Sequence, residues 1–130
     1  MLVPRTVLDR VGGLDESLFA YVEDVDWSLR ARRAGLSIVV CPASVVHHGV
    51  SAATGGASSP TSIYYALRNG LVVAERTAPL GPAGTARRRL EAVAAFTAQA
   101  LGSRSRRAAF RAVLDGLRDA RRGQLGRRER

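Results

Sequence analysis

The sequence predicts an α/β domain followed by amphipathic C-terminal helices. Residues 24–34 place apolar side chains at helical spacing, whereas residues 36–41 form a β-branched run that is typical of a strand. Two later segments, 86–101 and 104–122, again repeat apolar residues at helical intervals. Helix and strand therefore mix in the first part of the chain, and helices alone follow.

Charge also divides the chain. Residues 1–86 carry seven Arg and seven acidic residues, whereas residues 87–130 carry thirteen Arg and four acidic residues, a net +9. We expect a domain over residues 1–78 and a basic helical extension over residues 79–130. The basic excess points to an anionic partner, such as a membrane surface or nucleic acid.

The N-terminal elements lead into an acidic cluster. Residues 1–3 are apolar and predicted to end a strand, and a short helical turn over residues 6–11 is predicted to stop at Gly12 and Gly13. Residues 14–19 then form a polar loop with apolar anchors. This loop is predicted to place the acidic cluster at the start of the next helix.

Three carboxylates, Glu23, Asp24 and Asp26, open the helix predicted over residues 24–34. The positive end of a helix dipole favours an ionised carboxylate, which suits a general base. The alternative is helix capping, with Asp26 paired to Arg30 four residues later. Asp24 and Asp26 also form a D-x-D pattern of the kind that holds divalent cations. Because side chains two residues apart on a helix point about 200° apart, we expect only one of them to face a site.

The middle of the chain is predicted to be extended. Residues 36–41 and 43–48 are interpreted as two extended segments with a bend at Pro42. Cys41 lies in the apolar run, so we expect a buried thiol and no disulfide. Residues 49–60, rich in Gly, Ser, Thr and Ala, are predicted to form a mobile surface loop.

His47 and His48 end the second extended segment. Neighbouring residues on a strand point to opposite faces, so only one of them can face the acidic cluster. Imidazole is a common metal ligand. Two histidines without further Cys or His also leave a structural role open.

A helix is predicted to begin at Pro60. Its buried face repeats apolar residues at intervals of three or four: Ile63, Leu67, Leu71 and Ala74. It also carries two phenols, a guanidinium and an amide: Tyr64, Tyr65, Arg68 and Asn69. These polar groups indicate either part of a site or a half-buried helix with an ion pair. A linker over residues 77–85 follows.

The two C-terminal helices are amphipathic. The first is predicted to bury five residues: Leu90, Val93, Phe96, Ala100 and Leu101. The second has an apolar stripe of four: Phe110, Val113, Leu114 and Leu117. Arginines fall beside that stripe: Arg104, Arg107, Arg111, Arg118 and Arg122. Residues 123–130 are expected to be disordered.

Three roles remain open for the basic segment. Residues 104–122 suit an anionic membrane surface, or the helices pack on the domain and leave the arginines solvated. Nucleic acid is disfavoured because the segment lacks free aromatic residues for base stacking. The sequence shows no secretory signal and no run of eighteen apolar residues, so we expect a cytoplasmic protein, peripheral on the inner face of the membrane if it docks there.

Four segments occur in a particular order: Gly12-Gly13-Leu-Asp15-Glu-Ser-Leu-Phe19, Glu23-Asp24-Val-Asp26-Trp-Ser-Leu-Arg30-Ala-Arg-Arg-Ala-Gly35, Val46-His47-His48-Gly49, and Tyr64-Tyr65-Ala-Leu-Arg68-Asn69. Together they resemble the C-terminal half of family 2 glycosyltransferases, with the closest likeness to bacterial rhamnosyltransferase-like members. The resemblance covers about residues 1–76, and the four ordered motifs are far more specific than any one alone.

The resemblance implies an α/β GT-A fold, of which this chain would hold the acceptor side and lack the N-terminal nucleotide-binding half. Members are inverting enzymes that typically use Mg²⁺ or Mn²⁺. By resemblance, Asp24 would be the general base that takes the proton of the acceptor hydroxyl. His47, or as second choice His48, would help to hold the metal. Further residues would support the active site: Glu23, Asp26, Tyr64, Arg68 and Asn69.

Because the nucleotide-binding half and its own D-x-D are missing, we expect a fragment of a hexosyl- or rhamnosyltransferase that is inactive alone. In a complete enzyme the partners would be a nucleotide-sugar donor and a glycan or lipid-linked acceptor of cell-wall polysaccharide synthesis. The alternative is a non-catalytic binding module that uses the basic helices on a membrane or nucleic acid.

Overall fold

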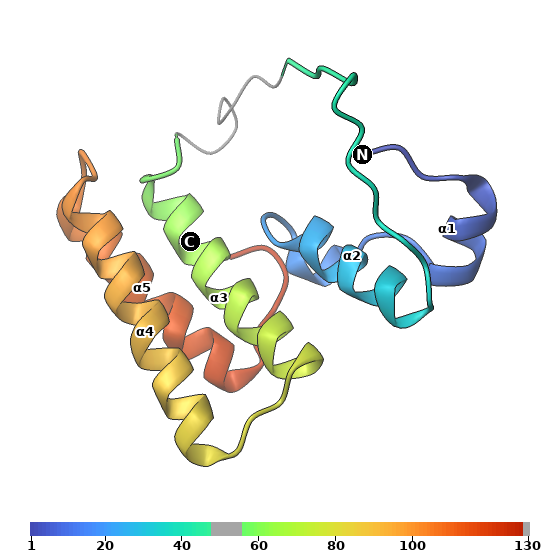
Figure 1. Ribbon diagram of the computed structural model, residues 1–130. Helices are drawn as coiled ribbons and strands as arrows, with labels where there is room; N and C mark the ends of the chain where they lie inside the picture. The colour runs from blue at the N-terminus through green and yellow to red at the C-terminus, as the bar shows by residue number, and fades with distance from the viewer. Residues whose placement is uncertain (48–55, 129–130) are drawn as a thin grey trace.

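The computed structural model describes residues 1–47 and 56–128, and their regular elements are all helical (Figure 1). In chain order these are α1 (Arg5–Val11), the 3₁₀ turn η1 (Glu16–Leu18), α2 (Glu23–Arg33), α3 (Pro60–Thr77), α4 (Pro82–Leu101) and α5 (Arg106–Arg122). The helices predicted from periodicity are confirmed with small shifts at their ends. No β-strand occurs in the described residues, those at positions 1–3 included, so the predicted α/β fold, and with it the partial GT-A fold, is wrong for them.

The two segments that were expected to be extended, 36–41 and 43–48, explain why no sheet forms in the described residues. The described part of both is irregular chain, and Val39 and Val40 are 83% and 84% exposed. A β-branched run prefers extended backbone, but it becomes a strand only when a neighbouring strand takes its hydrogen bonds and covers one face. No described segment does so. Cys41 is exposed, which corrects the expectation of a buried thiol.

α3 is the central helix and lies between α2 on one side and α4 and α5 on the other (Figure 1). Its first turn is capped by Ser59, whose hydroxyl accepts from the backbone N–H of Ser62 at 3.1 Å, and Pro60 occupies the first helical position. The predicted apolar face is confirmed for Ile63, Leu67 and Leu71, which are buried.

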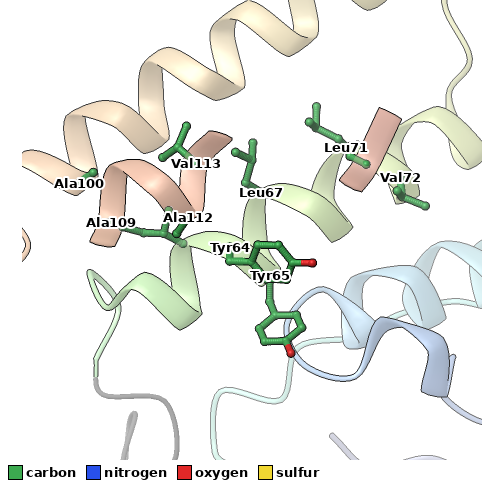
Figure 2. Close-up of a cluster of buried hydrophobic side chains, with 11 residues drawn as sticks. Tyr64, Tyr65, Leu67, Leu71, Val72, Ala100, Ala109, Ala112 and Val113 are labelled. Carbon is green, nitrogen blue, oxygen red and sulfur yellow. The ribbon is translucent and has the colours of Figure 1, made fainter. Parts of the chain in front are cut away.

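α5 packs on α3 through small side chains, as Figure 2 shows for Ala109 and Ala112. Gly116 lies in the same face, where an added Cβ would be 3.1 Å from the Tyr64 carbonyl oxygen. The predicted stripe of large residues is therefore partly wrong: Val113 is buried, but Leu114 is exposed. A face of Ala and Gly lets the two backbones approach closely.

α4 follows a short link after α3 and closes the bundle against α3 and α5. Of its predicted buried residues, Ala100 is fully buried, whereas Leu90 and Leu101 are exposed. The helices on either side of residue 78 thus share one core (Figure 2). Among the described helices, none combines the length and the apolar composition that crossing a membrane requires.

Candidate active site

The turn before α2 has an uncommon backbone. Phe19, Tyr21 and Val22 have φ angles of 64°, 65° and 72°. Positive φ costs a non-glycine residue about 1–3 kcal/mol, and a β-branched valine is an unusual occupant. Such a turn persists only where surrounding contacts impose it, so its contacts identify what positions the acidic cluster.

Asn69 on α3 supplies most of these contacts. It is fully buried, and its Nδ2 donates to the carbonyl oxygens of Leu18 at 2.9 Å, Ala20 at 2.7 Å and Tyr21 at 2.8 Å. Its Oδ1 accepts from Nε of Arg68 at 2.9 Å, which fixes the orientation of the amide. One side chain thereby satisfies the carbonyls that the turn directs inward and offsets part of its strain.

Arg68 is buried beside Asn69, with 1% of its surface exposed. Its guanidinium carbon lies 5.2 Å and 5.0 Å from the ring centres of Tyr64 and Tyr65. It donates to the Leu18 carbonyl at 3.1 Å and to the Gly126 carbonyl at 2.9 Å. A buried charge is tolerated only when it is well hydrogen-bonded, so these contacts are needed to keep the guanidinium in place.

A buried carboxylate of α5, Asp119, joins this network through Tyr64. The Tyr64 hydroxyl accepts from Arg68 at 3.3 Å and donates to Oδ2 of Asp119 at 2.8 Å. Burial, and then the hydrogen bond to the Asp119 carboxylate, raise the pKa of the Tyr64 phenol. Tyr64 therefore stays protonated and links the buried guanidinium to a buried carboxylate.

The chain after α5, residues 123–128, packs against η1 and α3 beside this turn. The Gly126 N–H donates to the Ser17 carbonyl at 2.5 Å, and the Arg128 N–H donates to the Tyr65 hydroxyl at 2.8 Å. The prediction that this segment is disordered is wrong for its described residues. The buried guanidinium requires the Gly126 carbonyl as an acceptor, which gives the segment a defined place.

Asp26 belongs to a second group of contacts, directed toward α1. It is buried, and its Oδ2 accepts from Nε of Arg30 at 2.8 Å. Arg30 also donates to the carbonyl oxygens of Val11 at 2.8 Å and Gly13 at 2.7 Å. Nε1 of Trp27 donates to the carbonyl oxygen between them, that of Gly12, at 2.8 Å. Of the two alternatives that the sequence leaves open for Asp26, the structure shows the ion pair.

Asp24 is the carboxylate that stays accessible. It is exposed in the first turn of α2, and its Oδ1 accepts from the Val25 N–H at 2.8 Å. Within the described residues it forms no ion pair. Glu23 beside it is half-buried, and one of its oxygens is buried without a hydrogen-bond partner there. A cavity of about 430 Å³ nearby includes Asp26 in its wall, but not Asp24.

Asp15 connects η1 to α3. Its carboxylate accepts from the Ser17 hydroxyl at 2.5 Å and pairs with Arg76 at 3.0 Å. These contacts, the Ser17 hydroxyl first, hold the pKa of the Asp15 carboxyl below its usual value.

Of the two expected metal ligands, only His47 lies in the described residues. His47 is exposed at the end of an irregular segment, and His48 lies outside the described residues. No three His, Cys, Asp or Glu side chains gather into a ligand set in residues 1–47 and 56–128. Mg²⁺ needs only one or two protein carboxylates when substrate phosphates complete its coordination, so binding of Mg²⁺ or Mn²⁺ stays a prediction.

Sequence reasoning placed Arg68 and Asn69 near a site but missed two of their supports, Asp119 and Gly126. The burial of Asp119 could have been predicted from the sequence, because Asp119 lies on the same helical face as Ala112 and Gly116. A carboxylate on a buried face needs a hydrogen-bonding partner. The role of Gly126 could not have been predicted from the sequence, since it contributes only a backbone carbonyl.

Comparison with known proteins gives a partial match. The chain is 49% identical over 49 residues to the N-acetylglucosaminyl-diphospho-decaprenol L-rhamnosyltransferase of Mycobacterium tuberculosis, in strains CDC 1551 / Oshkosh and ATCC 25618 / H37Rv. The matched stretch covers 37% of this chain and 16% of the length of each relative. No family model matches, and no solved structure matches. The similarity supports a glycosyltransferase-related function.

Proposed function

We propose that this chain provides the acceptor side of an inverting, family 2 glycosyltransferase, with Asp24 as the general base. The observation that carries the proposal is the placement of Asp24, which is exposed at the start of α2 behind a strained turn that Asn69 holds. Backbone strain maintained by buried polar contacts is a recurrent property of functional sites. The similarity to a rhamnosyltransferase supports the reaction class.

In the proposed reaction an acceptor hydroxyl attacks the anomeric carbon of a nucleotide-linked sugar. The new glycosidic C–O bond forms as the bond from that carbon to the diphosphate oxygen breaks, and the configuration inverts. The hydroxyl proton passes to the Asp24 carboxylate, which must lie about 2.6–3.2 Å from the hydroxyl oxygen. The dipole of α2 stabilises a carboxylate at this position. Arg68 and Asn69 act behind the turn as positioning residues.

The relatives are named for L-rhamnose transfer to N-acetylglucosaminyl-diphospho-decaprenol, and we propose an acceptor of the same class, a sugar on a polyprenyl diphosphate. The nucleotide-sugar, and Mg²⁺ or Mn²⁺ if one is used, would be held by a donor-binding half that acts together with this chain. We therefore expect the isolated chain neither to hydrolyse nor to transfer from a nucleotide-sugar.

A chimera tests the assignment of the base. The full chain, which includes the supporting contacts of Asp119 and Gly126, is joined to the donor-binding half of the rhamnosyltransferase relative, and transfer of radiolabelled rhamnose to the lipid acceptor is measured. We expect Asp24→Asn to lower kcat by about 10² to 10⁴, the usual contribution of a general base, with little change in KM for the donor.

Asp26→Asn is the matched control. It should lower the melting temperature, because it removes the ion pair that orients Arg30, and it should affect kcat less than Asp24→Asn. A severe loss of kcat in Asp26→Asn with a mild one in Asp24→Asn would show that the base is the other carboxylate. Turnover of a nucleotide-sugar by the isolated chain would refute the need for a separate donor-binding half.

A further inference from the structure

The outer faces of α4 and α5 expose leucines. Leu90 and Leu101 on α4 are 71% and 53% exposed, and Leu114 on α5 is 66% exposed. A single exposed leucine is ordinary on a protein surface, but three on two helices that pack against each other need an explanation.

Arginines surround Leu114 on the outer face of α5. At about 100° per residue, Arg107 and Arg121 lie within roughly 20° of Leu114, one on each side. Both arginines are exposed, as is Arg111. Arg107 and Arg111 have no ion-pair partner in the described residues. Their charges are therefore available to a partner.

A groove lies between the two helices. It has a volume of about 640 Å³, and its walls include Leu90 and Val93 from α4 with Leu117 and Arg121 from α5. Leu80, in the link before α4, lies at the same groove. Leu90 of α4 and Arg121 of the basic face of α5 thus line one depression, whose other walls are largely apolar.

We infer that the outer face of α4 and α5 docks on an anionic lipid membrane. Leu90, Leu101 and Leu114 enter the boundary between headgroups and acyl chains, and the arginines meet lipid phosphates. This role is independent of sugar transfer. The structure changes the residues expected to insert, because Val113 is buried against α3 and cannot do so.

Charge and composition favour a membrane over nucleic acid as the occupant. Both are anionic, but nucleic acid would leave the exposed leucines uncovered. Binding of single strands also uses aromatic side chains for base stacking, and Phe96 and Phe110, the aromatic residues of α4 and α5, are half-buried against the core.

Co-sedimentation of the full chain with vesicles tests the inference. At low salt we expect binding to equal parts of phosphatidylglycerol and phosphatidylcholine, weak binding to phosphatidylcholine alone, and release as salt rises. The double variant Arg107→Gln/Arg111→Gln should bind the anionic vesicles about thirtyfold more weakly. Leu90→Gln/Leu114→Gln, which keeps the charge, should weaken binding about tenfold or more.

Matched control variants remove the same types of side chain from surfaces outside α4 and α5. Arg5→Gln/Arg32→Gln removes two exposed arginines from α1 and α2, and Val39→Gln removes an exposed apolar side chain from the irregular segment. Both should bind as the wild type does, and circular dichroism should show every variant folded. Absence of wild-type binding at low salt overturns the inference. The inference is also overturned if Arg5→Gln/Arg32→Gln weakens binding to anionic vesicles as much as Arg107→Gln/Arg111→Gln does. If Leu90→Gln/Leu114→Gln binds anionic vesicles as tightly as the wild type does, and the wild type binds single-stranded RNA as tightly as it binds these vesicles, the face binds nucleic acid instead.

Discussion

Replacement of Asn69 by Asp tests whether this residue holds the turn before α2. The substitution keeps the shape of the side chain, so it creates no cavity, but it replaces the Nδ2 donor with an oxygen that faces three carbonyl oxygens. The carbonyl of Leu18 keeps its bond from Arg68, whereas those of Ala20 and Tyr21 lose the amide donor. At about 1–3 kcal/mol for each unsatisfied group, and with about 1 kcal/mol regained from the charged contact to Arg68, we expect a net loss of about 1–5 kcal/mol.

Urea unfolding followed by circular dichroism measures this loss, and hydrogen exchange locates it. Exchange of the amides in residues 18–22 should accelerate more than exchange in α4, because the turn opens first. Gln99→Glu is the matched control: it makes the same change from amide to carboxylate at an exposed bond to the Ala57 carbonyl and should cost under about 0.5 kcal/mol. If Asn69→Asp costs no more than Gln99→Glu, Asn69 does not hold the turn.

Three further predictions concern stability. Gly116→Ala should destabilise the chain by about 1–2 kcal/mol in a thermal melt, because its Cβ would crowd a carbonyl of α3; Gly70→Ala, with open space around it in the middle of a helix, should stabilise by about 0.5–1 kcal/mol. Val113→Ala should cost about 1–3 kcal/mol and Leu114→Ala well under 1 kcal/mol, since only Val113 is buried; an equal loss in urea unfolding would contradict this packing of α5. The wild type should be more stable than Asp15→Asn above about pH 4, the usual range for Asp, and this advantage should disappear as pH falls through the lowered pKa of the folded state; a pH series of melts in which the difference stays constant would rule this out.

The helices were predictable because each buries one face, and burial leaves a helical period in the sequence. α4 begins at Pro82, earlier than the apolar repeat indicated, because proline suits the first turn of a helix. The pairing of Asp26 with Arg30 was also visible as one of two alternatives, since residues four apart on a helix are neighbours.

The errors arise where structure depends on distant partners. A strand over residues 36–41 requires a neighbouring strand, which local preference does not supply. The large apolar residues of α5 predict the wrong packing face, because the helix packs on α3 through Ala and Gly, whose small side chains give a weak apolar signal. The burial of Arg68 was not predictable, because its acceptors come from residues 18 and 126. The general-base role of Asp24 stays a prediction.

The contact between Ser17 and Gly126 also sets an order of events during synthesis. Ribosomes add about 5–20 residues per second, so Gly126 is made about 5–20 s after Ser17. Helical hydrogen bonds form within microseconds and do not wait for distant segments. The turn at residues 19–22, in contrast, receives its last support only when the chain after α5 reaches Ser17 and Arg68 beside it. Until Gly126 has been made, a nascent chain therefore carries the carboxylate of Asp24 without the full arrangement that fixes it.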